Sequence, residues 1–186
     1  NHYKGHNRIK YFFKYFKPVV FILFYELFNS PHRFKYIKRF FHYFSFLIAR
    51  IYDAHQLELE LSKWVDLNKK EIIFYSYWFN LWVFDLSILK LKYPNMNIVS
   101  RAHGGDYDEA QRKDGFYLYR YFQMKQINKV FPISNYGLSY LSSQFPAHIS
   151  KISSSYLGIF DNGINPFNRV NDGVTIVSCS TLIPLK

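Results

Sequence analysis

Apolar positions recur at helical spacing through the first third of the chain. In the segment 31–52 they fall mainly on one side of a helical wheel, at Ile37, Phe40, Phe41, Phe44, Leu47 and Ile48. Ser30 and Pro31 mark the start of this segment, because serine is a good N-cap and proline suits the first helical turn. The pattern predicts helices over 7–29, 31–52 and about 54–67.

After residue 70 the pattern changes to short strand-like runs that alternate with helical segments. The predicted strands cover 71–76, 97–101, 129–133 and part of 151–159. The predicted helices cover roughly 79–92, 115–127 and 135–144. Strands that alternate with helices in this way are typical of a parallel α/β sheet. We therefore predict a Rossmann-like parallel sheet flanked by helices.

A change of composition indicates a domain boundary near the end of the chain. The segment 160–173 is rich in Asn, Gly, Asp and Pro and is interpreted as a linker, and 174–179 is a new strand-like run. We expect one domain over 1–165, with its basic amphipathic helices at 7–52, and the start of a second domain over 166–186. Because the chain begins at Asn1 and ends directly after this strand, we interpret it as a fragment cut at both ends.

The composition supports a folded protein whose positive charge lies mainly at one end. Apolar residues make up 49% of the 186 residues and charged residues 20%, which is enough for a packed core. The net charge is +11, and residues 1–50 hold ten Lys or Arg against one acid, Glu26. The basic character of the first segment therefore needs a local explanation.

The most apolar run, from Pro18 to Tyr25, is too short to span a bilayer, which takes about 18–20 residues. The single cysteine, Cys179, excludes an intrachain disulfide and favours a reducing compartment. His2 and His6 have the spacing of metal ligands but no third ligand nearby, so we expect no metal site there.

Candidate chemistry lies where predicted strands end, because ligands of parallel sheets bind at the carboxyl ends of strands. The strand 97–101 is followed by His103, Gly104 and Gly105. The glycines would let the backbone approach a ligand closely, and the histidine could bind a hydroxyl or phosphate or transfer a proton. The alternative is a tight turn with a polar loop residue.

A second strand end leads into a helix whose first residues are Ser134 and Asn135. The free N–H groups of such a helix end attract anions and polar ligands. An ordinary N-cap without a ligand remains the alternative at this position.

Several short motifs follow one another in an order that resembles the family 4 glycosyltransferases of GT-B architecture, over about residues 70–186. They are Arg101-Ala102-His103-Gly104, then Lys129-Val130-Phe131-Pro132-Ile133-Ser134-Asn135-Tyr136-Gly137, then Ser155-Tyr156-Leu157-Gly158-Ile159, then Ile176-Val177-Ser178-Cys179-Ser180 and Pro184-Leu185-Lys186. Within that family the resemblance is greatest to bacterial enzymes that build capsule, lipopolysaccharide or exopolysaccharide. The resemblance implies two Rossmann-like domains with the active site between them.

The resemblance also implies a reaction and roles for residues. A sugar would pass from a nucleoside diphosphate to an acceptor hydroxyl, usually with retention and without a metal or other cofactor. His103 matches a histidine near the transferred sugar, and Lys186 resembles a lysine that contacts the donor diphosphate. The substrate-binding candidates are Arg101, Gly104, Gly105, Asp106, Ser134 and Asn135. Because the paired-glutamate motif of the family would follow Lys186, we expect residues 1–186 to be inactive alone.

The expected partners are a nucleotide sugar, a saccharide or lipid-linked acceptor and an anionic membrane surface. The basic, aromatic helices of 7–52 suit peripheral attachment to the cytoplasmic membrane face. Packing of their apolar face on the sheet is the alternative. A nucleic-acid-binding module is a rival interpretation, although no nucleic-acid-binding motif occurs. A non-catalytic partner subunit with the same fold is another, and a downstream E-x7-E motif would separate it from an enzyme.

Overall fold

The computed structural model describes residues 16–112 and 115–158. Several predicted features lie outside these residues. They are the linker 160–173, the strand-like run 174–179, the donor-contact residue Lys186 and the beginning of the first predicted helix. None of the helices in the described part of the chain combines the length and apolar character that crossing a bilayer requires.

Three helices, α2 (Phe16–Asn29), α3 (Arg33–Lys38) and α4 (Phe40–Leu61), form the first third of the described chain. The helix predicted over 31–52 is broken at Arg39, and the second part continues through the predicted boundary near 53. No glycine or proline stands at the break. Tyr36 on α3 and Tyr43 on α4 both pack on Phe116, with ring centroids 5.5 and 5.9 Å away, so tertiary packing accompanies the break.

The strands β1 (Ile73–Ser76), β2 (Asn97–Ala102) and β3 (Lys129–Pro132) form one parallel sheet in the order β1-β2-β3. This confirms the predicted mixed α/β fold with a parallel sheet flanked by helices, which is compatible with a Rossmann-like domain. The fourth predicted strand is reduced to a single parallel bridge between Val130 and Ile152. The segment 146–151 before it is instead the 3-10 helix η2 (Pro146–Lys151).

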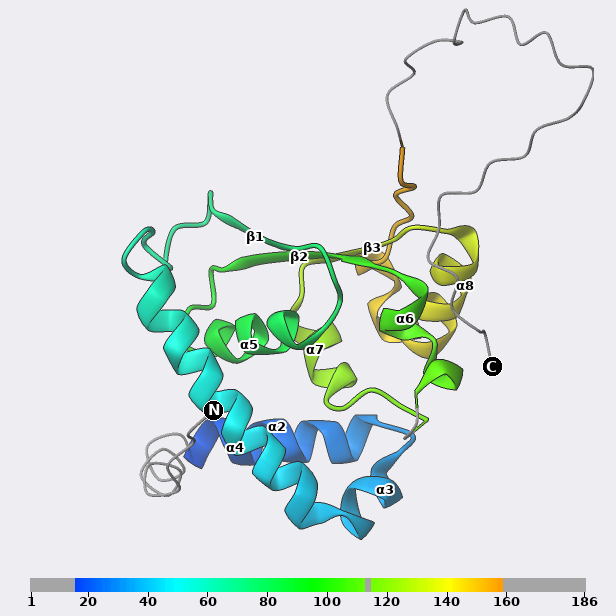
Figure 1. The fold of residues 1–186 in the computed structure, drawn as a ribbon, viewed down its shortest axis with the longest axis horizontal. Helices are drawn as coiled ribbons and strands as arrows, with labels where there is room; N and C mark the ends of the chain where they lie inside the picture. The colour runs from blue at the N-terminus through cyan, green and yellow to red at the C-terminus, as the bar shows by residue number, and fades with distance from the viewer. Residues whose placement is uncertain (1–15, 113–114, 159–186) are drawn as a thin grey trace, which may run out of the picture.

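The helices after the first strand are α5 (Leu81–Lys90), α6 (Gly104–Tyr107), η1 (Glu109–Gln111), α7 (Arg120–Gln126) and α8 (Asn135–Gln144). Figure 1 shows α5 and α7 as a layer beneath the sheet, with α2 and α4 forming a further layer below them. Helix α4 packs on α5 and α2 packs on α7, so the basic helices join the domain through its inner helices.

The two faces of the sheet differ. In β2 the side chains of Ile98, Ser100 and Ala102 are buried toward the helices, whereas the intervening residues are half-buried. On the opposite face Ile73 and Tyr75 of β1 are exposed, and Figure 1 shows no helix of the described residues over that face. Parallel sheets are usually covered on both faces, so this sheet is half-covered within the described residues.

A buried carboxylate joins the outer helix layer to the inner one. Glu26 of α2 accepts hydrogen bonds from the Tyr36 hydroxyl at 3.1 Å and from the backbone N–H of Phe122, in α7, at 3.0 Å. The Tyr36 hydroxyl also accepts a hydrogen bond from the Tyr119 N–H at 2.7 Å. Burial raises the pKa of the Glu26 carboxyl to about 7, although these hydrogen bonds oppose the shift.

Candidate functional site

The carboxyl ends of the three strands meet at one edge of the sheet, where Figure 1 shows α6 and α8. Ser76 ends β1, Ala102 ends β2 and Pro132 ends β3. Residue pairs Ser76–Ser100 and Ala102–Pro132 are in register, so the segments that follow the strands start close to one another. The candidate residues of the sequence lie in these segments.

His103 is the N-cap of α6 and is held by Asp106. The Asp106 carboxylate accepts a hydrogen bond from the His103 backbone N–H at 2.9 Å and lies 3.4 Å from the ring Nδ1. The side chain of His103 is 12% exposed, and its Nε2 is buried with no hydrogen-bond partner within the described residues. One ring nitrogen is thus oriented by a carboxylate, and the other keeps its hydrogen-bonding capacity for another group.

Two aromatic residues that are not among the predicted site residues pack on His103. The ring centroids of Tyr77 and Trp78 lie 5.0 and 4.2 Å from the imidazole centroid, and both side chains are exposed. They follow β1 directly, so the available signal was a pair of aromatics immediately after a predicted strand end. Such rings offer a rigid surface with both apolar and polar character to a ligand.

Gly104 and Gly105 form the first turn of the short helix α6 rather than a tight turn or an open loop. Among the described glycines only Gly115 has a positive φ. A Cβ at Gly104 or Gly105 would meet only the Gln111 side chain, at 3.6 and 4.0 Å, which are ordinary contacts. The local fold therefore does not require glycine at these two positions, and the space beside them is open.

The other three candidates lie at the ends of β2 and β3 and have different partners. Arg101 donates to the Ser155 hydroxyl at 3.3 Å, and the Tyr156 hydroxyl donates to the Asn135 side-chain oxygen. The Ser134 hydroxyl accepts a hydrogen bond from the Gly137 N–H at 3.1 Å, which confirms the predicted N-cap of α8. Arg101 and Asn135 thus contact the segment 155–156, Ser134 caps α8, and His103 contacts the segment after β1.

A cavity of about 310 Å³ opens beside the loops after β1 and β2. Gly105 and Asp106 line it, together with Asn80 at the start of α5 and the arginines Arg112 and Arg120. Its apolar wall comprises Phe46, Phe79, Leu81 and Leu118. An apolar cavity with a few convergent polar groups is the usual form of a small-molecule site, and this volume is at the lower end of the common range of about 300–1,000 Å³.

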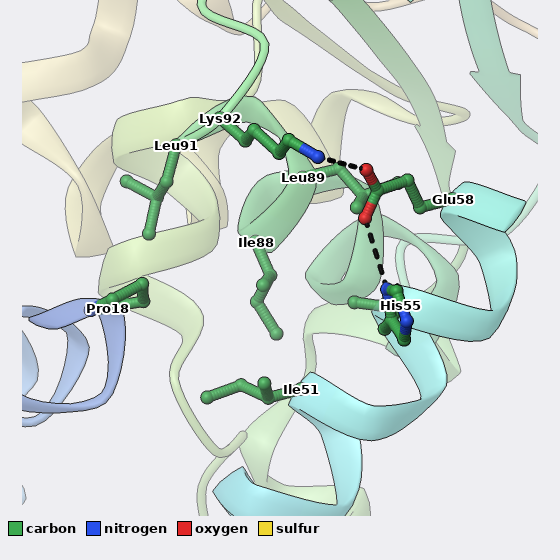
Figure 2. Close-up of a pocket in the computed structure, with 9 residues that line it drawn as sticks. Pro18, Ile51, His55, Glu58, Ile88, Leu89, Leu91 and Lys92 are labelled. Carbon is green, nitrogen blue, oxygen red and sulfur yellow. Dashed lines mark hydrogen bonds and ion pairs between the residues drawn. The ribbon is translucent and has the colours of Figure 1, made fainter. Parts of the chain in front are cut away.

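A second cavity of similar volume, about 310 Å³, lies between α2, α4 and α5 (Figure 2). Its floor is apolar, with Ile51 and Ile88 facing the space. Its ionisable groups already interact with one another, because Glu58 accepts a hydrogen bond from Lys92 at 2.5 Å and its Oε2 lies 3.3 Å from the Nδ1 of His55. None of the strand-end residues lines this cavity, so the first cavity is the better candidate for a ligand.

Within residues 16–112 and 115–158, no group of three or more His, Cys, Asp or Glu side chains is arranged to hold a metal ion. Comparisons with known protein families, with curated proteins and with solved structures find no match for this chain.

Proposed function

We propose that the chain is the acceptor-side part of a glycosyltransferase that transfers a sugar from a nucleoside-diphosphate sugar to an acceptor hydroxyl, as the motif resemblance implies. The observation that carries the proposal is the arrangement at the strand ends. An imidazole oriented by Asp106 packs against the exposed rings of Tyr77 and Trp78, next to the cavity lined by Gly105. The C–H faces of sugar rings pack well on aromatic rings.

In this proposal each group has a distinct role. Trp78 and Tyr77 hold the face of a sugar ring, and the Nε2 of His103, which is buried in this structure, hydrogen-bonds to a sugar hydroxyl near the reacting bond once these rings shift. The Asp106 carboxylate, at 3.4 Å from Nδ1, fixes the orientation of the imidazole. The donor nucleotide would be held mainly by a second domain of GT-B type that starts in 166–186, with Lys186 at its diphosphate.

We further propose that the protein works at an anionic membrane surface, where a lipid-linked acceptor would be available. The support is an exposed group of residues on α3 and at the start of α4, which we call the α3 surface: Arg33, Phe34, Ile37, Lys38 and Phe41. Phe34 is 72% exposed and Phe41 is 85% exposed. Aromatic side chains next to cations suit the lipid interface and its anionic headgroups.

Binding of simple saccharides tests the proposed site. We expect a saturable change in tryptophan fluorescence when the protein is titrated with methyl glycosides of glucose, galactose and mannose, for at least one of the three. Trp78→Ala should abolish the change, because it removes the ring that packs on His103. Trp64→Ala is the matched control, because Trp64 is exposed near the end of α4 and is absent from the site.

His103→Ala should weaken the same binding without loss of the folded circular dichroism spectrum. A response that is equal in the wild type and in Trp78→Ala, or no response to any of the three glycosides, would contradict the proposed sugar site.

A further inference from the structure

A buried arginine lies against the strand-end cavity without a carboxylate within ion-pair distance among the described residues. Arg120 is 5% exposed. Its guanidinium donates to the backbone oxygens of Phe79 at 2.9 Å and Asp106 at 2.8 Å, and to the Gln123 side chain at 3.1 Å. Its Nε is buried and has no hydrogen-bond partner in the described part of the chain.

The charge of Arg120 is therefore neutralised only at longer range. The Asp106 carboxylate is engaged by His103, and the Glu26 carboxylate is engaged by α7 and Tyr36. Aromatic faces supply part of the compensation, since the guanidinium lies 3.8 Å from the Phe79 ring centroid and 4.7 Å from that of Tyr117. A buried cation that is paired only with neutral groups is costly, and an anion in the adjoining cavity would offset this cost.

A second guanidinium contacts the same tyrosine. Arg112 is exposed, lies 5.1 Å from the Tyr117 ring centroid, and lines the same cavity as Arg120. Arg112 offers hydrogen-bond donors that a ligand can reach, whereas Arg120 adds a positive charge in surroundings of low dielectric constant. Two cations, Arg112 and Arg120, and one carboxylate, that of Asp106, line this cavity beside the carboxyl ends of β1 and β2, so its charged side chains carry one excess positive charge.

We propose that this cavity binds the phosphoryl group of a small ligand, with Arg112 as the direct contact and Arg120 as the buried charge. A phosphoryl group fits better than a single carboxylate, because it carries up to two negative charges and three acceptor oxygens, so it can interact with two guanidinium groups at once. The apolar wall of Phe46, Leu81 and Leu118 would contact the rest of the ligand. This inference rests on the cavity alone and does not depend on the proposed sugar transfer.

Inorganic phosphate is the probe that tests this site. The side-chain Nε–H signals of arginine are followed by ¹⁵N NMR while phosphate is added to the full chain at constant ionic strength. We expect saturable shifts of the Arg112 and Arg120 signals, and acetate at the same concentrations should give none. Arg112→Gln should weaken phosphate binding about tenfold, because it removes charge-assisted hydrogen bonds.

Arg33→Gln is the matched control, since it removes one exposed positive charge on α3 and lies outside the cavity. It should leave the phosphate affinity unchanged. Arg120→Lys, which keeps the charge, should retain more of the affinity than Arg120→Gln if both variants keep the folded spectrum. Equal weakening by Arg112→Gln and Arg33→Gln, shifts that do not saturate, or equal binding of acetate would overturn the proposal.

Discussion

Gly137 has no Cβ, and this allows α8 to lie close to β3. A Cβ at Gly137 would be 2.6 Å from the Tyr107 hydroxyl oxygen and 2.9 Å from the Pro132 Cβ, distances that packed atoms do not adopt. Both candidate segments contain glycine, but packing requires it only at Gly137 and not at Gly104 or Gly105.

We expect Gly137→Ala to lower the free energy of unfolding by about 1–3 kcal/mol, because α8 has to move away from β3. Urea unfolding followed by circular dichroism measures the change. Gly104→Ala is the control, since its new Cβ would make only a 3.6 Å contact with the Gln111 side chain. Equal stability of Gly137→Ala and the wild type would show that α8 adapts to the added methyl group without cost.

At the same scale, the sequence indicated some site residues and not others, for physical reasons. His103, Gly104 and Gly105 were recognisable because a histidine and two glycines follow a strand-like run. Tyr77, Trp78 and Arg120 were not, because aromatics are frequent throughout this chain and a single arginine gives no sign of burial. Whether a guanidinium is buried depends on residues such as Phe79, which lies 41 positions earlier in the chain.

At the scale of elements, the strands β1 to β3 and the helices α5 and α8 could be predicted, because short apolar runs and caps such as Ser134 are local signals. The break at Arg39 could not, since it depends on the packing of Tyr36 and Tyr43 on Phe116. The start of α7 was displaced for a similar reason. Tyr119 precedes it with a left-handed φ of 54°, while its hydroxyl donates to the Tyr43 backbone oxygen.

The α3 surface presents two exposed phenylalanines, Phe34 and Phe41, to a membrane. We expect Phe34→Ser/Phe41→Ser to reduce partitioning onto phosphatidylglycerol vesicles on the order of tenfold, since two exposed aromatic rings would no longer enter the interface. Vesicle sedimentation measures the bound fraction. Ile149→Ser/Leu157→Ser is the control, because it removes two exposed apolar side chains from other segments.

Binding to phosphatidylcholine vesicles should be much weaker than to phosphatidylglycerol, because the cations of the α3 surface gain little from neutral headgroups. Equal binding to both vesicle types, or an equal loss in the control pair, would refute attachment through this surface.

At the scale of the whole molecule, Glu26 links the outer helix layer to α7 and makes that link sensitive to pH. Its folded pKa of about 7 is above the ordinary value of 4.5, so the folded protein holds the proton more tightly than the unfolded chain does. The stabilising effect of this proton is complete below about pH 4.5 and is lost as the pH rises through 7.

Between pH 5 and pH 8 we therefore expect the free energy of unfolding of the wild type to fall by up to about 3 kcal/mol more than that of Glu26→Gln. Urea unfolding at several pH values measures both slopes. Glu71→Gln, at an exposed position, should keep the wild-type slope. Parallel slopes for the wild type and Glu26→Gln would mean that this carboxyl does not link stability to pH.

The Glu26 contact also sets a delay during biosynthesis. Phe122, which donates to its carboxylate, is 96 residues further along the chain. At a synthesis rate of roughly 5–20 residues per second, about 5 to 20 s pass between the appearance of the two residues. During that interval α2 lacks its inner partner α7, and its apolar face is accessible to a membrane or a chaperone before the domain closes over it.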